Sequence, residues 1–343
     1  MSTTLHNSII ALVCLSVLLA GGVSPAAAQE DNGGVEIAEL SAETERAIEH
    51  GLEFLARSQS ANGSWGGDRY PMANTATALM AFMLKGHFPG RGKYGDQLNK
   101  AVAWMLEQGR QRNGYLGGEK QGMYEHGLAT LALSEAWGEA PQDDIRDALK
   151  AAVDVIFRSQ DSSGGWRYEP KPNSADISVT VMQIVALSSA REAGILVPDE
   201  VLRNALTYVR ACQHPFQGGF SYQNNHGDPA FPRSAAGVMS YYMLGQGDTP
   251  GVQRGLDYLL RQDDAKFVKV EHYFYAHYYA IQVMYQSGDK QYQQWYPKIR
   301  DALLRKQQSD GSWGGGGGGQ GYSTAMAILI LGVPYRYLPI YQR

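Results

Sequence analysis

Apolar and polar positions follow one another along the chain as pairs of segments with helical spacing. In the first segment of each pair, apolar residues recur every three or four positions among charged ones, as at Ile48, Leu52 and Leu55, which is typical of an amphipathic helix. The second segment is rich in small and apolar residues and has few charges, which is typical of a helix buried on most sides. These second helices are expected over residues 75–85, 124–137, 176–192, 233–244, 275–286 and 322–331.

A short motif joins the two helices of each pair. Gln-x-x-x-Gly-x-Trp occurs in full from Gln59 to Trp65, from Gln160 to Trp166 and from Gln307 to Trp313, and looser copies follow Gln108, Gln213 and Gln262. The aromatic residues of the six copies fall at positions 65, 115, 166, 220, 267 and 313. A period of about 50 residues indicates one supersecondary unit that is used six times.

Six helical hairpins can stack as an open solenoid or close into a ring. An open solenoid needs a terminal repeat with a polar outer face at each end. The second helices are apolar on nearly all sides and neither end of the repeat array has such a repeat, which favours the ring. We therefore predict an all-α protein, an α/α toroid of about six helical hairpins, with the second helices as an inner barrel and the first helices as an outer wall. The glycine run Gly314–Gly319 is then a loop between an outer and an inner helix. It is not a phosphate-binding loop, because no strand precedes it.

The first residues differ in character from the rest of the chain. An apolar run from Ile9 to Ala20 leads to Ala26-Ala27-Ala28, which is typical of a secretory signal that is cleaved after Ala28. We predict a signal peptide over residues 1–28, a linker over 29–40 and the repeat domain over 41–340. The protein is then exported, to the periplasm or the medium. After removal of the signal, no stretch is long and apolar enough for a membrane span.

Composition removes several classes of function. The net charge of −4 gives no basic surface for nucleic acid. Cys212 is the only cysteine after the signal, so neither a disulfide framework nor a multi-cysteine metal site is expected. We predict no metal and no cofactor, and the sequence indicates no particular protein partner.

The Gln-x-x-x-Gly-x-Trp turns between paired helices resemble the repeat of the superfamily that contains squalene–hopene cyclases and protein prenyltransferases. The resemblance covers about residues 41–340 and implies an α/α toroid. A single toroid is similar to the β subunit of protein prenyltransferases, whose zinc lies on Asp, Cys and His. No Asp-x-Cys opens an inner helix here, and Cys212 ends an outer helix, so we do not expect that zinc site.

The segment from Ser163 to Leu187 resembles the acid motif of the cyclases, Asp-x-Asp-Asp-Thr. Residue by residue, the first Asp of the motif falls on Asp176, the Asp that protonates the alkene on Ser178, the third Asp on Val179 and the Thr on Thr180. A serine hydroxyl is too weak an acid to protonate an alkene. The resemblance therefore implies a cyclase-like protein that has lost cyclase activity.

The starts of the inner helices are expected to surround one mouth of the central cavity, so their polar residues are the candidate site. The catalytic candidates are Asp176, His126 and His277. The candidates for ligand binding are Tyr124, Glu125, Arg233, Tyr275 and Tyr322. A functional Asp176 is expected to pair with a cation such as Arg233, or with His126 or His277. A second interpretation is that these Tyr and His side chains only satisfy helix ends and one another.

Three functions remain open from the sequence. The first is binding of an apolar or elongated ligand, similar to an isoprenoid, in the central cavity without cyclisation. The second is an exported polysaccharide lyase or glycosidase that uses the same inner-helix residues as acid, base and charge stabiliser. The third is a scaffold without enzymatic activity, whose outer face binds another protein.

Overall fold

The computed structural model describes residues 40–67, 69–224, 227–262 and 269–335. The chain divides into two units, Met1–Val35 and Glu36–Arg343, and only the second contains described residues. The predicted signal peptide lies outside the described residues, as do the linker before residue 40, the turn aromatic Phe267 and the last residues of the predicted repeat domain.

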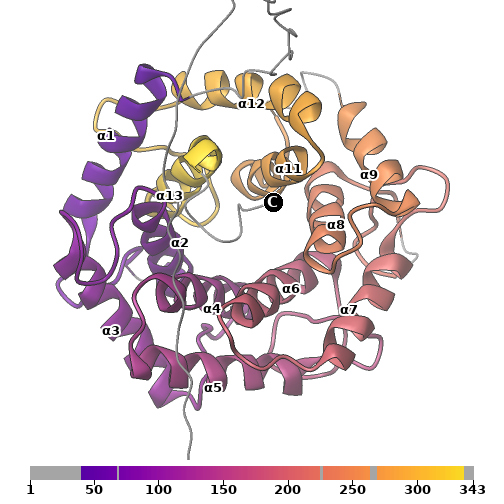
Figure 1. Cartoon of the computed structure of the whole chain (residues 1–343), viewed down its shortest axis with the longest axis horizontal. Coiled ribbons are helices and arrows are strands. Elements are labelled where there is room, and N and C mark those ends of the chain that lie inside the picture. Colours follow the sequence, from indigo (N-terminus) through magenta and orange to yellow (C-terminus); the bar gives the residue numbers. More distant parts are fainter. Residues whose placement is uncertain (1–39, 68, 225–226, 263–268, 336–343) are drawn as a thin grey trace, which may run out of the picture. The chain divides into compact units, whose positions relative to one another are not determined.

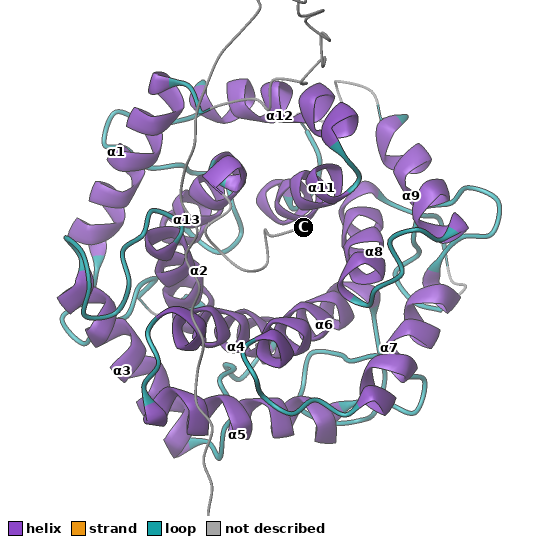
Figure 2. Cartoon of the chain, viewed as in Figure 1, coloured by secondary structure: helices purple, strands orange, loops and turns teal. Residues whose placement is uncertain are grey.

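The second unit is a two-layered ring of helices, with no strand among its described residues (Figures 1 and 2). The outer helices are α1 (Ala42–Ser58), α3 (Gly95–Gln111), α5 (Asp143–Ser159), α7 (Asp199–Cys212), α9 (Pro250–Leu260) and α12 (Asp289–Leu304). The inner helices are α2 (Pro71–Met83), α4 (Gly122–Glu139), α6 (Ile177–Glu192), α8 (Phe231–Met243), α11 (Tyr273–Gln286) and α13 (Gln320–Leu331), followed by the short 3₁₀ helix η1 (Val333–Tyr335).

The inner ring is closed. Each inner helix packs against the next one in sequence, and α13 packs against α2. Except for α7, which packs equally on α6 and α8, each outer helix packs more on the inner helix that precedes it than on the one that follows, so α1 lies chiefly against α13, at the other end of the chain. The predicted α/α toroid of six hairpins is therefore confirmed.

Local sequence explains the two kinds of helix. Helix α1 begins at Ser41, whose hydroxyl accepts the Thr44 N–H, and it carries acidic residues in its first turn and Arg57 in its last. Its apolar face alone is buried. Helix α2 is uncharged, and it is buried from Met72 to Met83. Five of the six inner helices begin two to four residues before their predicted starts, because Pro71, Gly122 and other turn residues open them. Helix α6 begins one residue after its predicted start, because Asp176 is its N-cap.

The Gly-x-Trp turns bind the two helices of each hairpin together. The indole Nε1–H of Trp166 donates to Ile156 O on the outer helix at 2.8 Å. Its backbone N–H donates to Thr180 Oγ1 on the inner helix at 3.0 Å. Trp65 and Trp313 make the same two bonds, and all three tryptophans are buried, as expected.

The turn glutamines join neighbouring hairpins. Gln160 Nε2 donates to Gly164 O at 2.8 Å in its own turn and to Val201 O at 2.9 Å in the next outer helix. Gln307 makes the corresponding bond to Ala47 O at 2.8 Å, which links the last turn to α1. Glycine is required in these turns, because Gly164 has φ +97° and a Cβ there would lie 2.1 Å from Asn204 O.

The predicted register of the second copy is wrong. Gln108 lies inside α3, which continues to Gln111, so it does not begin a turn. The place of the turn tryptophan is taken by Leu116 and not by Tyr115, because the Leu116 N–H donates to the inner helix, here to His126 Nδ1 at 3.0 Å. Asp143 and Asp144 lie in the first turn of outer helix α5, where acidic side chains offset the helix dipole.

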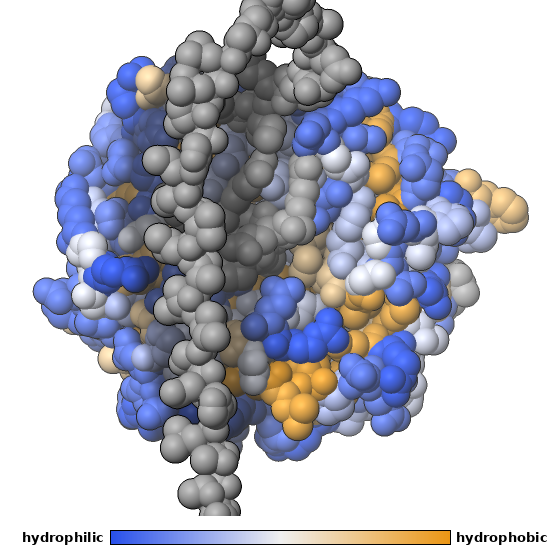
Figure 3. Space-filling model, in the orientation of Figure 1, coloured by the Kyte–Doolittle hydropathy of each residue, from blue (hydrophilic) through white to orange (hydrophobic). Residues whose placement is uncertain are grey.

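The outer wall is mostly hydrophilic, as the blue rim of Figure 3 shows. None of the described helices is both long enough and apolar enough to cross a bilayer.

Candidate functional site

The first turns of the inner helices meet at one end of the ring, as predicted. Glu125 on α4 accepts the backbone N–H groups of Met72 and Ala73 at 3.1 and 3.3 Å, so its carboxylate caps the start of α2. Burial raises the pKa of Glu125, and these backbone hydrogen bonds oppose the rise. Glu125 therefore joins α4 to α2. On α6, Gln183 Nε2 donates to Met123 O at 2.9 Å and so joins α6 to α4.

Four tyrosines gather at this end, and we call Tyr124, Tyr275, Tyr279 and Tyr322 the tyrosine cluster. Burial raises the pKa of each phenol, and Tyr279 is also affected by the nearby phenols of the other three. Tyr124, Tyr275 and Tyr322 stand at the third position of three different inner helices, and each is partly exposed. Three of the predicted ligand-binding residues are thus together.

The cluster lies over Ser178, the residue that stands where the cyclases have their protonating acid. The Tyr275 hydroxyl donates to Ser178 O at 3.5 Å, and the Tyr279 hydroxyl reaches Met182 Sδ at 3.0 Å. Because α8 separates α6 from α11, these contacts run across the inside of the ring. The acid position is therefore occupied by a hydroxyl beneath aromatic rings.

His126 has a structural role in this geometry. Its side chain is fully buried, its Nδ1 accepts the Leu116 N–H at 3.0 Å and its Nε2 is 3.1 Å from Ala152 O. Burial lowers the pKa of His126 to about 4. Its place in the hairpin is the one that Thr75, Thr180, Ser234 and Thr324 hold in other repeats, where a hydroxyl accepts the turn N–H.

His277 occupies the same position on α11, the fifth residue of the helix, as His126 does on α4. It is buried away from solvent among aromatic rings, with the Tyr273 ring centre 4.5 Å away and that of Phe231 at 5.7 Å. The predicted turn of this repeat, which contains Phe267, lies outside the described residues.

Asp176 caps α6 from behind the tyrosine cluster. Its Oδ1 accepts the Val179 N–H at 3.0 Å, its Oδ2 is buried, and the Tyr222 hydroxyl lies close enough to lower the pKa of the carboxyl group. Burial raises the pKa of Asp176 to about 6, and the Val179 N–H and the Arg167 charge act against the rise. Arg167 also lies over the ring of Tyr168.

The expected pairing of Asp176 with Arg233 is wrong. The Arg233 guanidinium donates to Phe220 O at 3.1 Å and to Asp228 O, so it braces the loop before α8. His126 does not serve as the partner either, because backbone groups occupy both of its ring nitrogens. Backbone carbonyl groups of its own loop therefore hold the Arg233 guanidinium.

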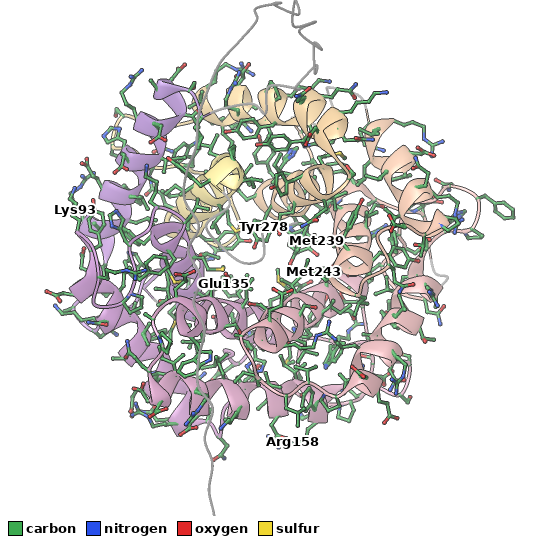
Figure 4. All side chains as sticks on the ribbon, in the orientation of Figure 1. Lys93, Glu135, Arg158, Met239, Met243 and Tyr278 are labelled. Carbon is green, nitrogen blue, oxygen red and sulfur yellow. The ribbon has the colours of Figure 1, made fainter. Side chains whose placement is uncertain are left out.

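Further along the inner helices, the lining of the ring is largely apolar. Figure 4 shows Met239, Met243, Tyr278 and Glu135 around the centre of the ring, with Lys93 and Arg158 on its rim. Glu135 is buried, and its Oε1 accepts the Ser189 hydroxyl at 2.8 Å. These lining residues were not identified from the sequence, because nearly every position of an inner helix is apolar and no pattern marks the face that points inward.

The described residues hold no group of three or more His, Cys, Asp or Glu that could bind a metal ion. Cys212 is buried, and burial raises the pKa of its thiol to about 12, which keeps it protonated.

No family model and no curated protein matches this chain. Solved structures do share its fold. The GH76A α-1,6-mannanase from Salegentibacter sp. HEL1_6 superposes with a TM-score of 0.64 at 9% identity, over 84% of this chain and 98% of the mannanase. A possible GH105 member from Klebsiella pneumoniae gives 0.61 at 14% identity, over 87% and 94% of the two chains.

The type II terpene cyclase MstE from Scytonema is also similar. It superposes with a TM-score of 0.55 at 16% identity, over 86% of this chain and 99% of MstE. The identities are too low to carry a function. The comparisons therefore establish the α/α toroid, a fold that terpene cyclases and glycosidases share.

Proposed function

We propose that this protein binds an elongated, largely apolar ligand along the inside of the ring and does not cyclise it. The observation that carries the proposal is the tyrosine cluster above Ser178. Partly exposed rings from three inner helices supply apolar area with hydroxyl groups at its edge. Met243, which lies near the centre of the ring and is partly exposed, extends this apolar surface.

The absence of cyclisation follows from the chemistry of the groups at this end. Protonating an alkene needs a carboxylic acid at the position that Ser178 occupies. Asp176 is buried behind the cluster, and a carboxyl group with a pKa of about 6 is mostly ionised at neutral pH. An isoprenoid-like chain would therefore bind and leave unchanged.

Binding can be tested with geranylgeraniol in a detergent at low concentration, followed by quenching of intrinsic fluorescence. Tyr275→Ala is expected to weaken binding about tenfold or more, because it removes the ring that crosses to α6. Phe216→Ala is the control, since Phe216 is 92% exposed on an outer loop. Equal affinities for the wild type and Tyr275→Ala would contradict the proposal, and so would a cyclised product in the extract.

A glycan-active enzyme is the second candidate, and the mannanase superposition favours it. One solved form of that mannanase is an inactive variant with two consecutive aspartates replaced by alanine, in complex with α-1,6-mannotetrose. The consecutive pair Asp143-Asp144 of this chain opens an outer helix instead. Asp176 and Glu125 would have to act as the two carboxyl groups. Release of smaller sugars from α-1,6-mannotetrose, lost in Asp176→Asn, would establish this candidate in place of the first.

We also propose that the protein is exported after cleavage of residues 1–28, to the periplasm or the medium. The support is the signal-like composition of this segment. Mass spectrometry of protein recovered from the cell envelope or medium should find Gln29 as the first residue. An intact N-terminus at Met1 or Ser2 would contradict the cleavage.

A further inference from the structure

The glycine loop, Gly314–Gly319, borders the tyrosine cluster. A Cβ on Gly318 would lie 2.7 Å from the ring of Tyr322, and a Cβ on Gly316 would lie 3.2 Å from the ring of Phe274. Glycine suits φ values of +90° at Gly315 and +95° at Gly319. At Gly317 neither a positive φ nor a contact within 4 Å requires it. The fold alone therefore does not explain six consecutive glycines.

A buried acceptor without a partner lies next to this loop. Asn74 on α2 is 1% exposed, and its Nδ2 donates to the carbonyl groups of Arg69, Tyr70 and Gly318 at 3.0–3.1 Å. Three carbonyl acceptors fix which end of the amide is nitrogen. The Oδ1 atom accepts from no donor in the described ranges, and a Cβ on Gly321 would lie 2.9 Å from it.

Such an atom is unfavourable unless something binds it. A buried acceptor without a donor destabilises the folded state, so an alternative side chain would be more stable here if stability were the only demand. The loop beside it holds backbone donors that no other protein group accepts. Within the described part of the chain, no acceptor receives the backbone N–H groups of Gly314, Gly315, Gly317 and Gly318.

We propose that Asn74 and the glycine loop bind a hydroxyl group of the ligand, which the loop admits by moving aside. The inference rests on the proposed function and specifies the polar end of the ligand. A hydroxyl is both donor and acceptor, so it can donate to Asn74 Oδ1 and accept an N–H of the loop. Six glycines give the loop the backbone freedom that opening needs. Tyr322 makes this hydroxyl site continuous with the tyrosine cluster.

The test compares geranylgeraniol with the hydrocarbon of the same chain that lacks the hydroxyl group. The wild type should bind the alcohol about tenfold more tightly, as one hydrogen-bonded hydroxyl allows. Gly321→Ala places a methyl group against Asn74 Oδ1 at a helical position where alanine is otherwise favourable. This variant should bind the two ligands equally, with an unchanged affinity for the hydrocarbon.

Gly138→Ala is the matched control. It is also a helical glycine, with nothing within 4 Å of the added Cβ, so it should keep the tenfold preference. Gly317→Ala supplies a second variant that introduces no contact and only restricts the loop. It should weaken binding of the alcohol several-fold and leave the hydrocarbon unaffected. Thermal melting confirms that each variant is folded.

The outcomes separate this inference from the proposed function. If the wild type binds the alcohol and the hydrocarbon equally, the hydroxyl site is overturned and apolar binding stands. The same conclusion follows if Gly321→Ala still binds the alcohol more tightly than the hydrocarbon. Binding of neither isoprenoid overturns the proposed function. A parallel binding measurement with α-1,6-mannotetrose tests whether the hydroxyl group belongs to a glycan instead of an isoprenoid alcohol. Binding of that sugar alone, lost in Gly321→Ala, supports the hydroxyl site and assigns it to a glycan.

Discussion

At the scale of single residues, burial shifts the pKa values of His126 and Asp176 so that both favour the uncharged form. The pKa of His126 falls to about 4, below its unfolded value near 6.5, so the unfolded chain binds more protons between these values. Its contribution to stability is complete above pH 6.5 and is lost as the pH falls towards 4. Asp176 behaves oppositely. With a folded pKa of about 6, it favours folding increasingly as the pH falls from 6 to 3.8.

Asp176→Asn should therefore stabilise the protein in alkaline solution. Asparagine keeps the N-cap of α6 and removes a buried charge. A pKa raised by about two units corresponds to roughly 3 kcal/mol at most, so the free energy of unfolding should rise by up to that amount at pH 8. Below pH 4 the gain should vanish, because the wild-type carboxyl group is then protonated. Urea unfolding at the two pH values measures this, and an equal effect at both would contradict the assigned pKa.

Trp166→Ala should lower the free energy of unfolding by roughly 3–5 kcal/mol, because it empties a fully buried site and leaves Ile156 O without its donor. Trp104→Ala is the comparison, since Trp104 is only partly buried on outer helix α3, and it should cost less. Both are measured by urea unfolding. Equal losses would mean that the turn tryptophan is not a structural centre of the hairpin.

At the scale of the elements, hydrogen bonds from the turn glutamines link one hairpin to the next one. Gln59, Gln160, Gln213 and Gln307 each donate both to their own turn and to the following outer helix. Two turns are exceptions among the described residues. The second turn has no such glutamine, because Gln108 lies inside α3, and the Gln262 amide donates to Tyr258 O in its own helix. These two turns therefore lack the glutamine link between hairpins.

Gln160→Ala is expected to cost about 1–2 kcal/mol, because two backbone carbonyl groups lose their donor. Gln262→Ala occupies the same place in the repeat and should cost less than about 0.5 kcal/mol, since it breaks no link between hairpins. Chemical denaturation of the two variants beside the wild type gives both values. The reverse order would show that the bridging bonds do not hold the ring.

Much of this arrangement could be predicted from the sequence, because three full copies of Gln-x-x-x-Gly-x-Trp fix the turns and the small, uncharged second helices imply burial. The second copy was misplaced by one residue since Leu116 replaces the tryptophan, and the nearest aromatic residue, Tyr115, took its place in the pattern. Local packing at that turn is set by a backbone bond to His126, which the motif does not contain.

The candidate site was predicted less well. Tyr124, Tyr275 and Tyr322 do meet, because equal positions on the inner helices lie at the same end of the ring. His126 was misjudged as a catalytic candidate, although the series Thr75, Thr180, Ser234 and Thr324 could have revealed the position as a turn acceptor. Asn74 was missed, since an asparagine within a buried helix has no spacing that distinguishes it.

At the scale of the whole helical unit, closure makes the six hairpins depend on one another. Since α13 packs on α2 and α1 packs on α13, no described hairpin has a free end from which unfolding can spread. Tryptophan fluorescence and far-ultraviolet circular dichroism should therefore lose their signals at the same urea concentration. Transitions that separate by probe would indicate a stepwise array, as expected of an open solenoid.

The bond from Gln307 to Ala47 O has a consequence for the order of the chain. It is the same bond that Gln160 makes to Val201 O, so the last hairpin meets the first as any hairpin meets its successor. Nothing in the packing marks α1 as the beginning. The repeat unit should therefore tolerate circular permutation, with its ends rejoined near α1 and α13 and new termini opened in an exposed loop such as the one around Leu196.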